Sequence, residues 1–212
     1  MKIGQSSDDE RFSHRLEAFS DVVIGFSLAQ LSLNLTFPKH VADLFYQPFG
    51  LAAFVFTFIV ICVFWLRHHR WFAHYFTPTP FNVTLNFVIL GAIVLLAYAL
   101  QIFLHFLRIG SDFFPAFSIY IAAFGAVMLL FGIAYFVGAA APKRVMTADV
   151  RRLGYVQALR LCGAAFGVVV GLFVVSHGTG FETATFVVAF CIAGGALLGR
   201  VAGNAYGRRA VP

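Results

Sequence analysis

Hydrophobic residues run along this chain in long blocks that shorter polar segments separate. A transmembrane helix needs about 20 mostly apolar residues to cross a hydrocarbon core about 30 Å thick. The blocks lack the strict alternation of β-barrel strands, whose spans need only about 9–11 residues. We therefore predict an all-α, polytopic membrane protein with six transmembrane helices: Leu16–Leu35, Phe49–Arg67, Val83–Leu107, Phe113–Val137, Leu153–Ser176 and Phe181–Arg200.

The composition supports this class of protein. Apolar residues make up 60% of the chain and charged residues 11%, whereas a soluble domain has about 45–50% and about 25%. An ordinary soluble globule and a disordered chain are therefore excluded. The three cysteines (Cys62, Cys162 and Cys191) all fall within predicted spans, so we expect buried thiols and no disulfide framework.

The lysines and arginines predict the orientation. Twelve of the 15 fall in the first polar segment, after span two, after span four or after span six. Because positive loops stay inside, we expect both termini to be cytoplasmic. The chain then divides into a polar tail (1–15), a transmembrane domain (16–200) and a basic tail (201–212). The net charge of +6 indicates contact with anionic membrane lipids, and we expect no nucleic-acid partner.

The first span is the least apolar of the six. Its polar residues are Glu17, Ser20, Asp21, Ser27, Gln30, Ser32 and Asn34. Polar groups at membrane depth are costly unless paired or hydrated, and they suggest function. Helical spacing puts Ser20, Ser27, Gln30 and Asn34 on one arc. The neighbouring arc holds Val22, Phe26, Ala29 and Leu33. The polar arc either lines a path or bonds to a neighbouring helix, and the spacing leaves both interpretations open.

The second span ends in the segment FWLRHHRWF, which contains Trp65, His68 and His69. Adjacent side chains on a helix point about 100° apart, so two neighbouring histidines do not readily chelate one metal ion. We expect no metal site. A carboxylate near the same membrane depth, either Glu17 or Asp21, is the partner that we expect for this pair.

Two glycine faces mark the last two spans. Gly163, Gly167 and Gly171 lie four residues apart on span five, and Gly195, Gly199 and Gly203 do so on span six. Small residues at this spacing let helix backbones approach closely. The two faces form either packing within one chain or an interface between chains.

Two motifs resemble those of the transmembrane protein 175 family, the bacterial and endolysosomal potassium channels. Arg15 to Asp21 reads RLEAFSD, of the form RxxxFSD, at the start of span one. Trp65, His68, His69 and Phe72 follow at the end of span two. The resemblance is strongest over residues 11–35 and 54–72.

This resemblance implies a non-enzymatic potassium channel without bound cofactors, for which K⁺ is the permeant ion. It implies a homotetramer in the cell membrane, here the bacterial inner membrane, with the first helix of each subunit lining the pore. Apolar side chains then replace the TVGYG filter of ordinary potassium channels. The implied constriction residues are Phe26, Gln30 and Leu33, together with Ala29. The implied structural network comprises Arg15, Phe19, Ser20, Asp21, Trp65 and His68 or His69.

The constriction departs from the family pattern, which usually has Ile or Leu at these positions and a threonine where Ala29 stands. Four phenylalanine rings around an axis would close a pore or gate it by dewetting. A proton or solute transporter and a non-conducting structural subunit are therefore alternatives. A membrane enzyme ranks last, because no catalytic motif is present. We expect Arg160, inside span five, to extend its charge to the cytoplasmic face.

Overall fold

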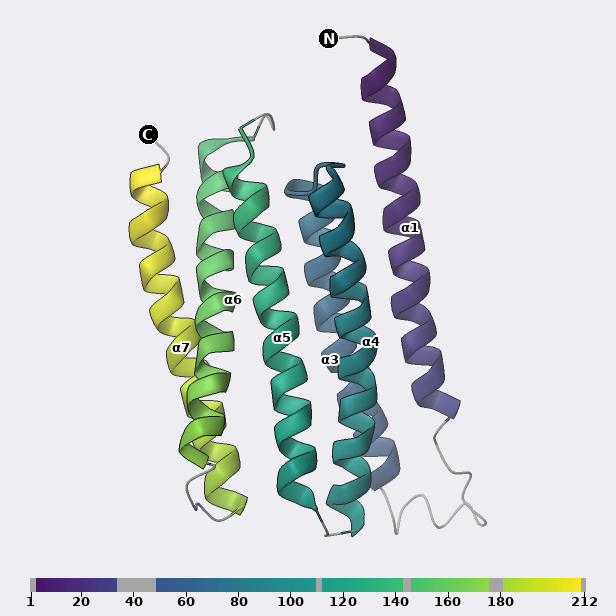
Figure 1. Ribbon diagram of the computed structural model, residues 1–212, viewed down its shortest axis with the longest axis vertical. Coiled ribbons are helices and arrows are strands. Elements are labelled where there is room, and N and C mark those ends of the chain that lie inside the picture. The colour runs from purple at the N-terminus through teal and green to yellow at the C-terminus, as the bar shows by residue number, and fades with distance from the viewer. Residues whose placement is uncertain (1–2, 34–48, 110–111, 143–145, 176–180, 211–212) are drawn as a thin grey trace.

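The computed structural model describes residues 3–33, 49–109, 112–142, 146–175 and 181–210, with side chains over 8–29, 54–106, 112–142, 146–175 and 183–210. These ranges contain six helices and no strand, so the all-α prediction is confirmed (Figure 1). The helices are α1 (Ile3–Leu33), α3 (Phe49–His74), α4 (Pro80–Ile109), α5 (Phe113–Ala140), α6 (Ala148–Val175) and α7 (Phe181–Ala210).

The helices extend beyond the apolar blocks that predicted them. α1 begins at Ile3 and not at Leu16, α3 continues past Arg67 to His74, and α7 continues past Arg200 to Ala210. Apolar residues indicate where a helix meets lipid, whereas its ends depend on caps and helix breakers. The 1–15 segment, predicted as a polar tail, is therefore helical from Ile3 onwards.

A proline-containing turn separates α3 from α4. Pro80 is the first residue of α4, where its missing N–H is not needed. The hydroxyl of Thr79 accepts the Asn82 backbone N–H at 3.3 Å, as a helix N-cap does. The Asn82 side-chain amide also donates to the Thr77 backbone oxygen at 2.9 Å. The turn therefore fixes where α3 ends and α4 begins.

Within the described residues, four helical segments are long and apolar enough to cross a membrane: Pro80–Phe106, Phe113–Ala140, Ala148–Val175 and Thr183–Ala210. The chain is therefore a multi-pass membrane protein. Spanning by α1 and α3, and with it the count of six spans, stays a prediction. α1 begins and α7 ends at the same end of the bundle (Figure 1).

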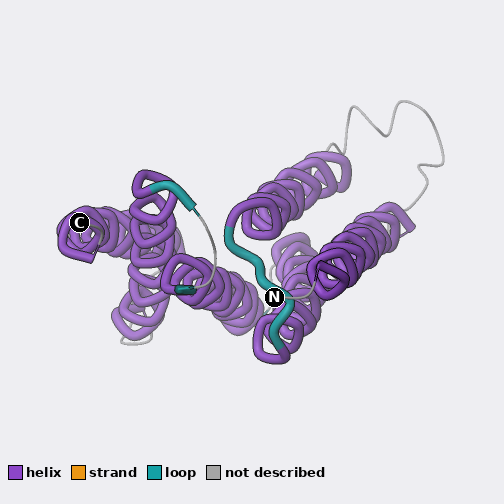
Figure 2. Tube along the Cα trace, turned by 90° about the horizontal axis from the view of Figure 1, so that it is seen from above, coloured by secondary structure: helices purple, strands orange, loops and turns teal. Residues whose placement is uncertain are grey.

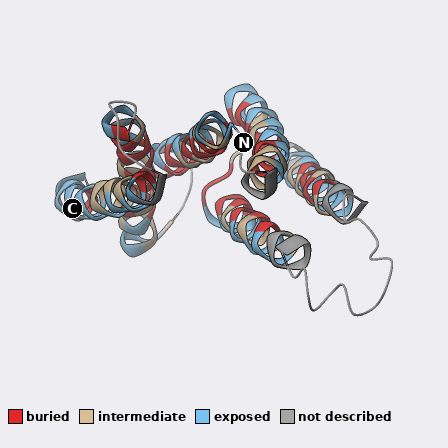
Figure 3. Ribbon diagram, turned by 90° about the horizontal axis from the view of Figure 1, so that it is seen from below, coloured by how far each residue is buried: buried red, intermediate tan, exposed pale blue. Residues whose placement is uncertain are grey.

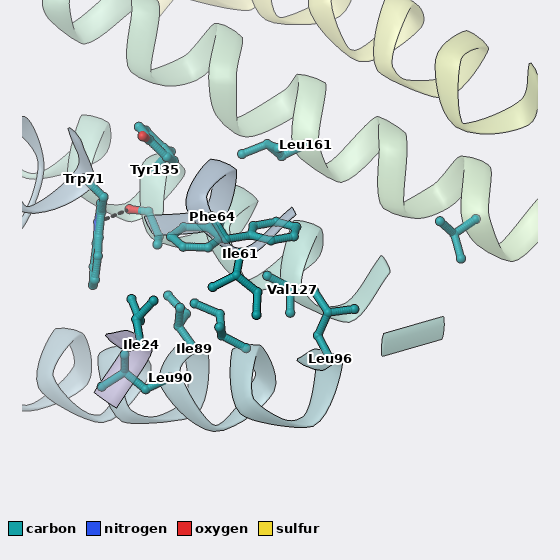
Figure 4. Close-up of a cluster of buried hydrophobic side chains, with 14 of the residues drawn as sticks. Ile24, Ile61, Phe64, Trp71, Ile89, Leu90, Leu96, Val127, Tyr135 and Leu161 are labelled. Atoms are coloured by element: carbon teal, nitrogen blue, oxygen red, sulfur yellow. Dashed lines mark hydrogen bonds between the residues drawn. The ribbon is translucent and has the colours of Figure 1, made fainter. Parts of the chain in front are cut away.

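The bundle has two groups of helices, α5 to α7 on one side and α1, α3 and α4 on the other (Figure 2). α4 packs on α5 and joins the groups, and α1 lies mainly against α3 and α4. The buried residues follow the faces that the helices turn towards one another (Figure 3). A central cluster combines Ile24 of α1 with Ile61 and Phe64 of α3 and Ile89 of α4 (Figure 4). One face of α1 is therefore part of the core.

The two glycine faces meet each other inside a single chain. A Cβ added at Gly163 would collide with the backbone oxygen of Gly195, and one added at Gly195 would collide with that of Gly163. The same holds for Gly167 against the backbone oxygen of Cys191. Of the two interpretations left open by the spacing, the structure selects packing between α6 and α7 of one subunit.

We expect Gly195→Ala to destabilise the protein by about 1–3 kcal/mol, the usual penalty for overpacking a tight contact. Gly194→Ala is the matched control, because a Cβ there meets nothing within 4 Å and alanine is the better helix former. Thermal unfolding in detergent should show a lower Tm for Gly195→Ala only. Equal Tm values for the two variants would contradict the close α6–α7 approach.

Candidate functional site

A hydrogen bond joins α1 to α3 at the signature aspartate. The Trp65 indole Nε1 donates to Asp21 Oδ1 at 2.8 Å. The indole also stacks on the His69 ring, with a centroid distance of 6.1 Å. A carboxylate near the membrane gains from an N–H donor, because hydrogen bonds to charged groups are stronger than neutral ones. This contact fixes the rotation of α1 relative to α3.

A second set of hydrogen bonds runs from α3 through α4 to α1. His68 is fully buried, and its Nε2 is 2.7 Å from Asn86 Oδ1. Because an amide oxygen only accepts, Nε2 is the donor in this pair. Asn86 Nδ2 in turn donates to Ser20 Oγ at 3.1 Å, and the Ser20 hydroxyl donates to the backbone oxygen of Leu16 at 2.8 Å.

His69 takes a partner of its own. Its Nδ1 lies 3.0 Å from Glu17 Oε1, which is the carboxylate of α1 one turn before Asp21. The two adjacent histidines thus reach different residues, as their separation around the helix requires. Of the two expected carboxylate partners, Glu17 contacts a histidine, whereas Asp21 binds Trp65.

Asn86 completes this network, and the sequence analysis did not single it out. It lies in the long apolar stretch that begins α4, and an amide there is the signal that would have identified it, because a buried amide at membrane depth needs partners. Asn82, one turn earlier, is buried as well. The amide of Asn86 is the only described side chain here that bonds to both α3 and α1.

The outward face of α1 carries an exposed apolar stripe. Phe19, Val22, Phe26 and Ala29 follow one another at spacings of three, four and three residues, and all are exposed. Phe26 has 68% of its surface exposed. Gly25 is also on this side, and a Cβ there would meet nothing. Gln30 and Leu33 belong to the helix α1, but the structure does not describe their side chains.

The serine arc of α1, which neighbours this stripe, is turned into the bundle. Ser20 and Ser27 are buried, and the Ser27 hydroxyl donates to the backbone oxygen of Val23 at 3.0 Å. The interpretation of this arc as the lining of a path is therefore wrong for Ser20, which bonds to α4. Burial of this face leaves the apolar arc on the outside.

Arg15 and Phe19 lie on the outward side, away from the hydrogen-bonded network. Arg15 is exposed and, with Asp8, Arg11 and Phe87, borders a hollow of about 520 Å³ beside α1. Phe19 packs edge-on against Phe87, with a centroid distance of 6.0 Å. Within one chain, the described residues bring together Ser20, Asp21, Trp65, His68 and His69, and Arg15 joins none of their hydrogen bonds.

The spacing of the stripe is the one that helices use to pack around a common axis. Positions repeating every 3.5 residues form the seam of a left-handed coiled coil. Exposure alone does not distinguish the stripe, since Phe190 on α7 is 80% exposed as well. The distinguishing feature is that the opposite face of α1 is fixed by hydrogen bonds to α3 and α4.

Comparison with known proteins matches this part of the chain. Residues 15–96 match the model of the family described as the endosomal/lysosomal potassium channel TMEM175. A protein of Streptomyces collinus named a potassium channel is 28% identical over 130 residues, which cover 56% of this chain and 61% of that relative. The chain thus spans less than two thirds of the relative's length. No solved structure matches.

The matched segment contains both motifs on which the resemblance was based, RLEAFSD and the tryptophan–histidine cluster. It also contains α1 from Arg15 onwards, all of α3 and the first half of α4, which are the helices that supply the hydrogen-bonded network. The resemblance is therefore confirmed, and it is to a class of channels, not of enzymes.

Proposed function

We propose that this chain forms a K⁺ channel with a pore lined by α1, on the premise that residues 15–96 match the model of the transmembrane protein 175 family of potassium channels. The observation that carries the proposal is the two-sided character of α1. One face is anchored by hydrogen bonds to α3 and α4, and the other presents an exposed apolar stripe with Phe26 at its most exposed point.

The proposed assembly is a homotetramer of six-span subunits in a bacterial inner membrane, with both termini in the cytoplasm. Four copies of α1 then surround one axis, and the stripe faces that axis. The 3.5-residue spacing of the stripe supports such packing, because it keeps one seam facing a common axis along the whole helix.

The constriction that we propose is formed by the Phe26 rings, with Ala29, Gln30 and Leu33 further along α1. A hydrophobic constriction controls conduction by dewetting: a narrow apolar ring expels water and thereby blocks hydrated ions. The network holds each ring in place. A turn of α1 by one residue would move its side chains by about 100°, which would take Phe26 away from the axis.

The experiment that tests this function is ion flux into liposomes that contain the purified protein. We expect K⁺ flux above that of protein-free liposomes, either in the native chain or once Phe26 is truncated to alanine. Absence of K⁺ flux in both forms, with the protein shown to be folded and inserted, would contradict a channel. It would favour a non-conducting membrane subunit instead.

A further inference from the structure

A cavity of about 520 Å³ lies among α3, α4, α5, α6 and α7, away from the proposed pore helix. Its volume is within the range of small-molecule sites, about 300–1,000 Å³. None of the described side chains of α1 lines it. Its function is therefore separate from conduction along α1, and its test does not depend on the channel proposal.

Two arginines line this cavity, one from each side. Arg67 comes from α3 and Arg160 from α6. The Arg67 Nε is buried and has no hydrogen-bond partner among the described residues. The Tyr135 hydroxyl donates to the backbone oxygen of Arg67 at 3.0 Å and so holds this part of α3 in place. Arg160 therefore borders this cavity, whereas the sequence predicts that its charge reaches the cytoplasmic face.

The cavity offers these cations no counter-charge from the described residues. No carboxylate is among its lining side chains, and the ion pair between described residues lies elsewhere, at His69 and Glu17. Two like charges in a poorly hydrated site repel each other and lose hydration, and an anion between them relieves both effects. The planar guanidinium group suits phosphate and carboxylate oxygens.

The other walls of the cavity are apolar. They include the rings of Phe103, Phe117 and Phe124, together with Ala189 and Ala193 of α7. Along α3 the lining extends from Phe56 to Arg67, which is about 16 Å at 1.5 Å per residue. The charged groups thus lie towards the end of the cavity nearer the α3 C-terminus, and hydrocarbon-like walls extend away from them.

We propose that this cavity binds an anionic phospholipid, with the phosphate held by Arg67 and Arg160 and one acyl chain lying along the aromatic walls. An acidic headgroup joined to a hydrocarbon tail is the ligand chemistry that satisfies both ends of the site. Basic pockets between helices on the cytoplasmic side are recognised binding sites for anionic headgroups.

Native mass spectrometry of the full-length, delipidated protein tests this proposal, with phosphatidylglycerol as the probe and phosphatidylcholine, oleate and inorganic phosphate as comparisons. We expect phosphatidylglycerol to bind more tightly than the other three. Arg67→Gln and Arg160→Gln should each weaken its binding about tenfold to a hundredfold, the value of a charge-assisted hydrogen bond. Arg70→Gln, an exposed change on the same helix, should leave binding unchanged.

A second pair of variants tests the tail end without removing a charge. Ala193→Phe places a ring on the open wall of the cavity, whereas Ala202→Phe places the same ring on an exposed part of α7 outside it. Only the first should reduce phosphatidylglycerol binding. The proposal would be overturned if phosphatidylcholine bound as tightly as phosphatidylglycerol, or if oleate bound more tightly. It would also be overturned if Ala193→Phe, Arg67→Gln and Arg160→Gln all left phosphatidylglycerol binding unchanged.

Discussion

Phe26→Ala is expected to raise K⁺ flux at least tenfold over the native chain in liposomes. Phe26 is the most exposed of the large hydrophobic side chains described on α1, and in the proposed tetramer four of its rings meet at the axis. Truncation to alanine widens the constriction and removes apolar surface, so the dewetted state becomes less favourable. A tenfold change in rate needs the barrier to fall by only about 1.4 kcal/mol.

The matched control for this change is Phe190→Ala. Phe190 is a phenylalanine of similar exposure on α7, at the far side of the bundle. Its truncation removes the same atoms from a surface that faces lipid in the proposed assembly, so flux should stay at the native level. If Phe26→Ala and Phe190→Ala gave the same flux, Phe26 would not form a constriction.

The second large effect is expected when the hydrogen bond between His68 and Asn86 is removed, because this bond is part of the buried network that joins α3, α4 and α1. His68→Phe keeps a ring against Phe72 and Trp71 but leaves Asn86 Oδ1 without its donor. An unsatisfied buried polar atom costs about 1–3 kcal/mol. We therefore expect a lower stability, measured by unfolding in detergent, and reduced K⁺ flux as α1 loses its fixed position.

A double-mutant cycle separates this hydrogen bond from general packing. Asn86→Leu alone leaves the His68 Nε2 donor unpaired, whereas His68→Phe with Asn86→Leu removes both partners, which is often nearly neutral. The double variant should be more stable than the sum of the single changes by about 0.6–2 kcal/mol, the range for hydrogen bonds between membrane helices. Strict additivity would show that the two side chains do not interact energetically.

Apolar blocks were sufficient to predict the helices but not their ends. Each predicted span lies mostly within one helix, because lipid and helix packing both require continuous apolar stretches. The ends differ where polar residues continue the helix, as at Ile3 and Ala210. At these positions the apolar block has ended, but the polar residues beyond it still form helix.

The sequence also predicted which residues of the site meet, but not all of their partners. The family resemblance implied a network of Ser20, Asp21, Trp65 and the two histidines, and it also included Arg15 and Phe19, which take no part in the observed hydrogen bonds. Asn86 was not predicted, because neither the two motifs nor the apolar pattern of α4 indicates that this amide contacts α1 and α3. Which arc of α1 is buried depends on the positions of α3 and α4, and spacing along a single helix does not contain that information.

Cross-linking at position 26 tests the central claim, that α1 lines an axis shared by several copies, most directly. Phe26→Cys would be introduced after Cys62, Cys162 and Cys191 are changed to alanine, and the purified protein in liposomes treated with a short bifunctional maleimide. We predict covalent dimers for Phe26→Cys and monomers for the control Phe190→Cys. Monomers at position 26, in protein that remains folded, would contradict the placement of α1 at a common axis.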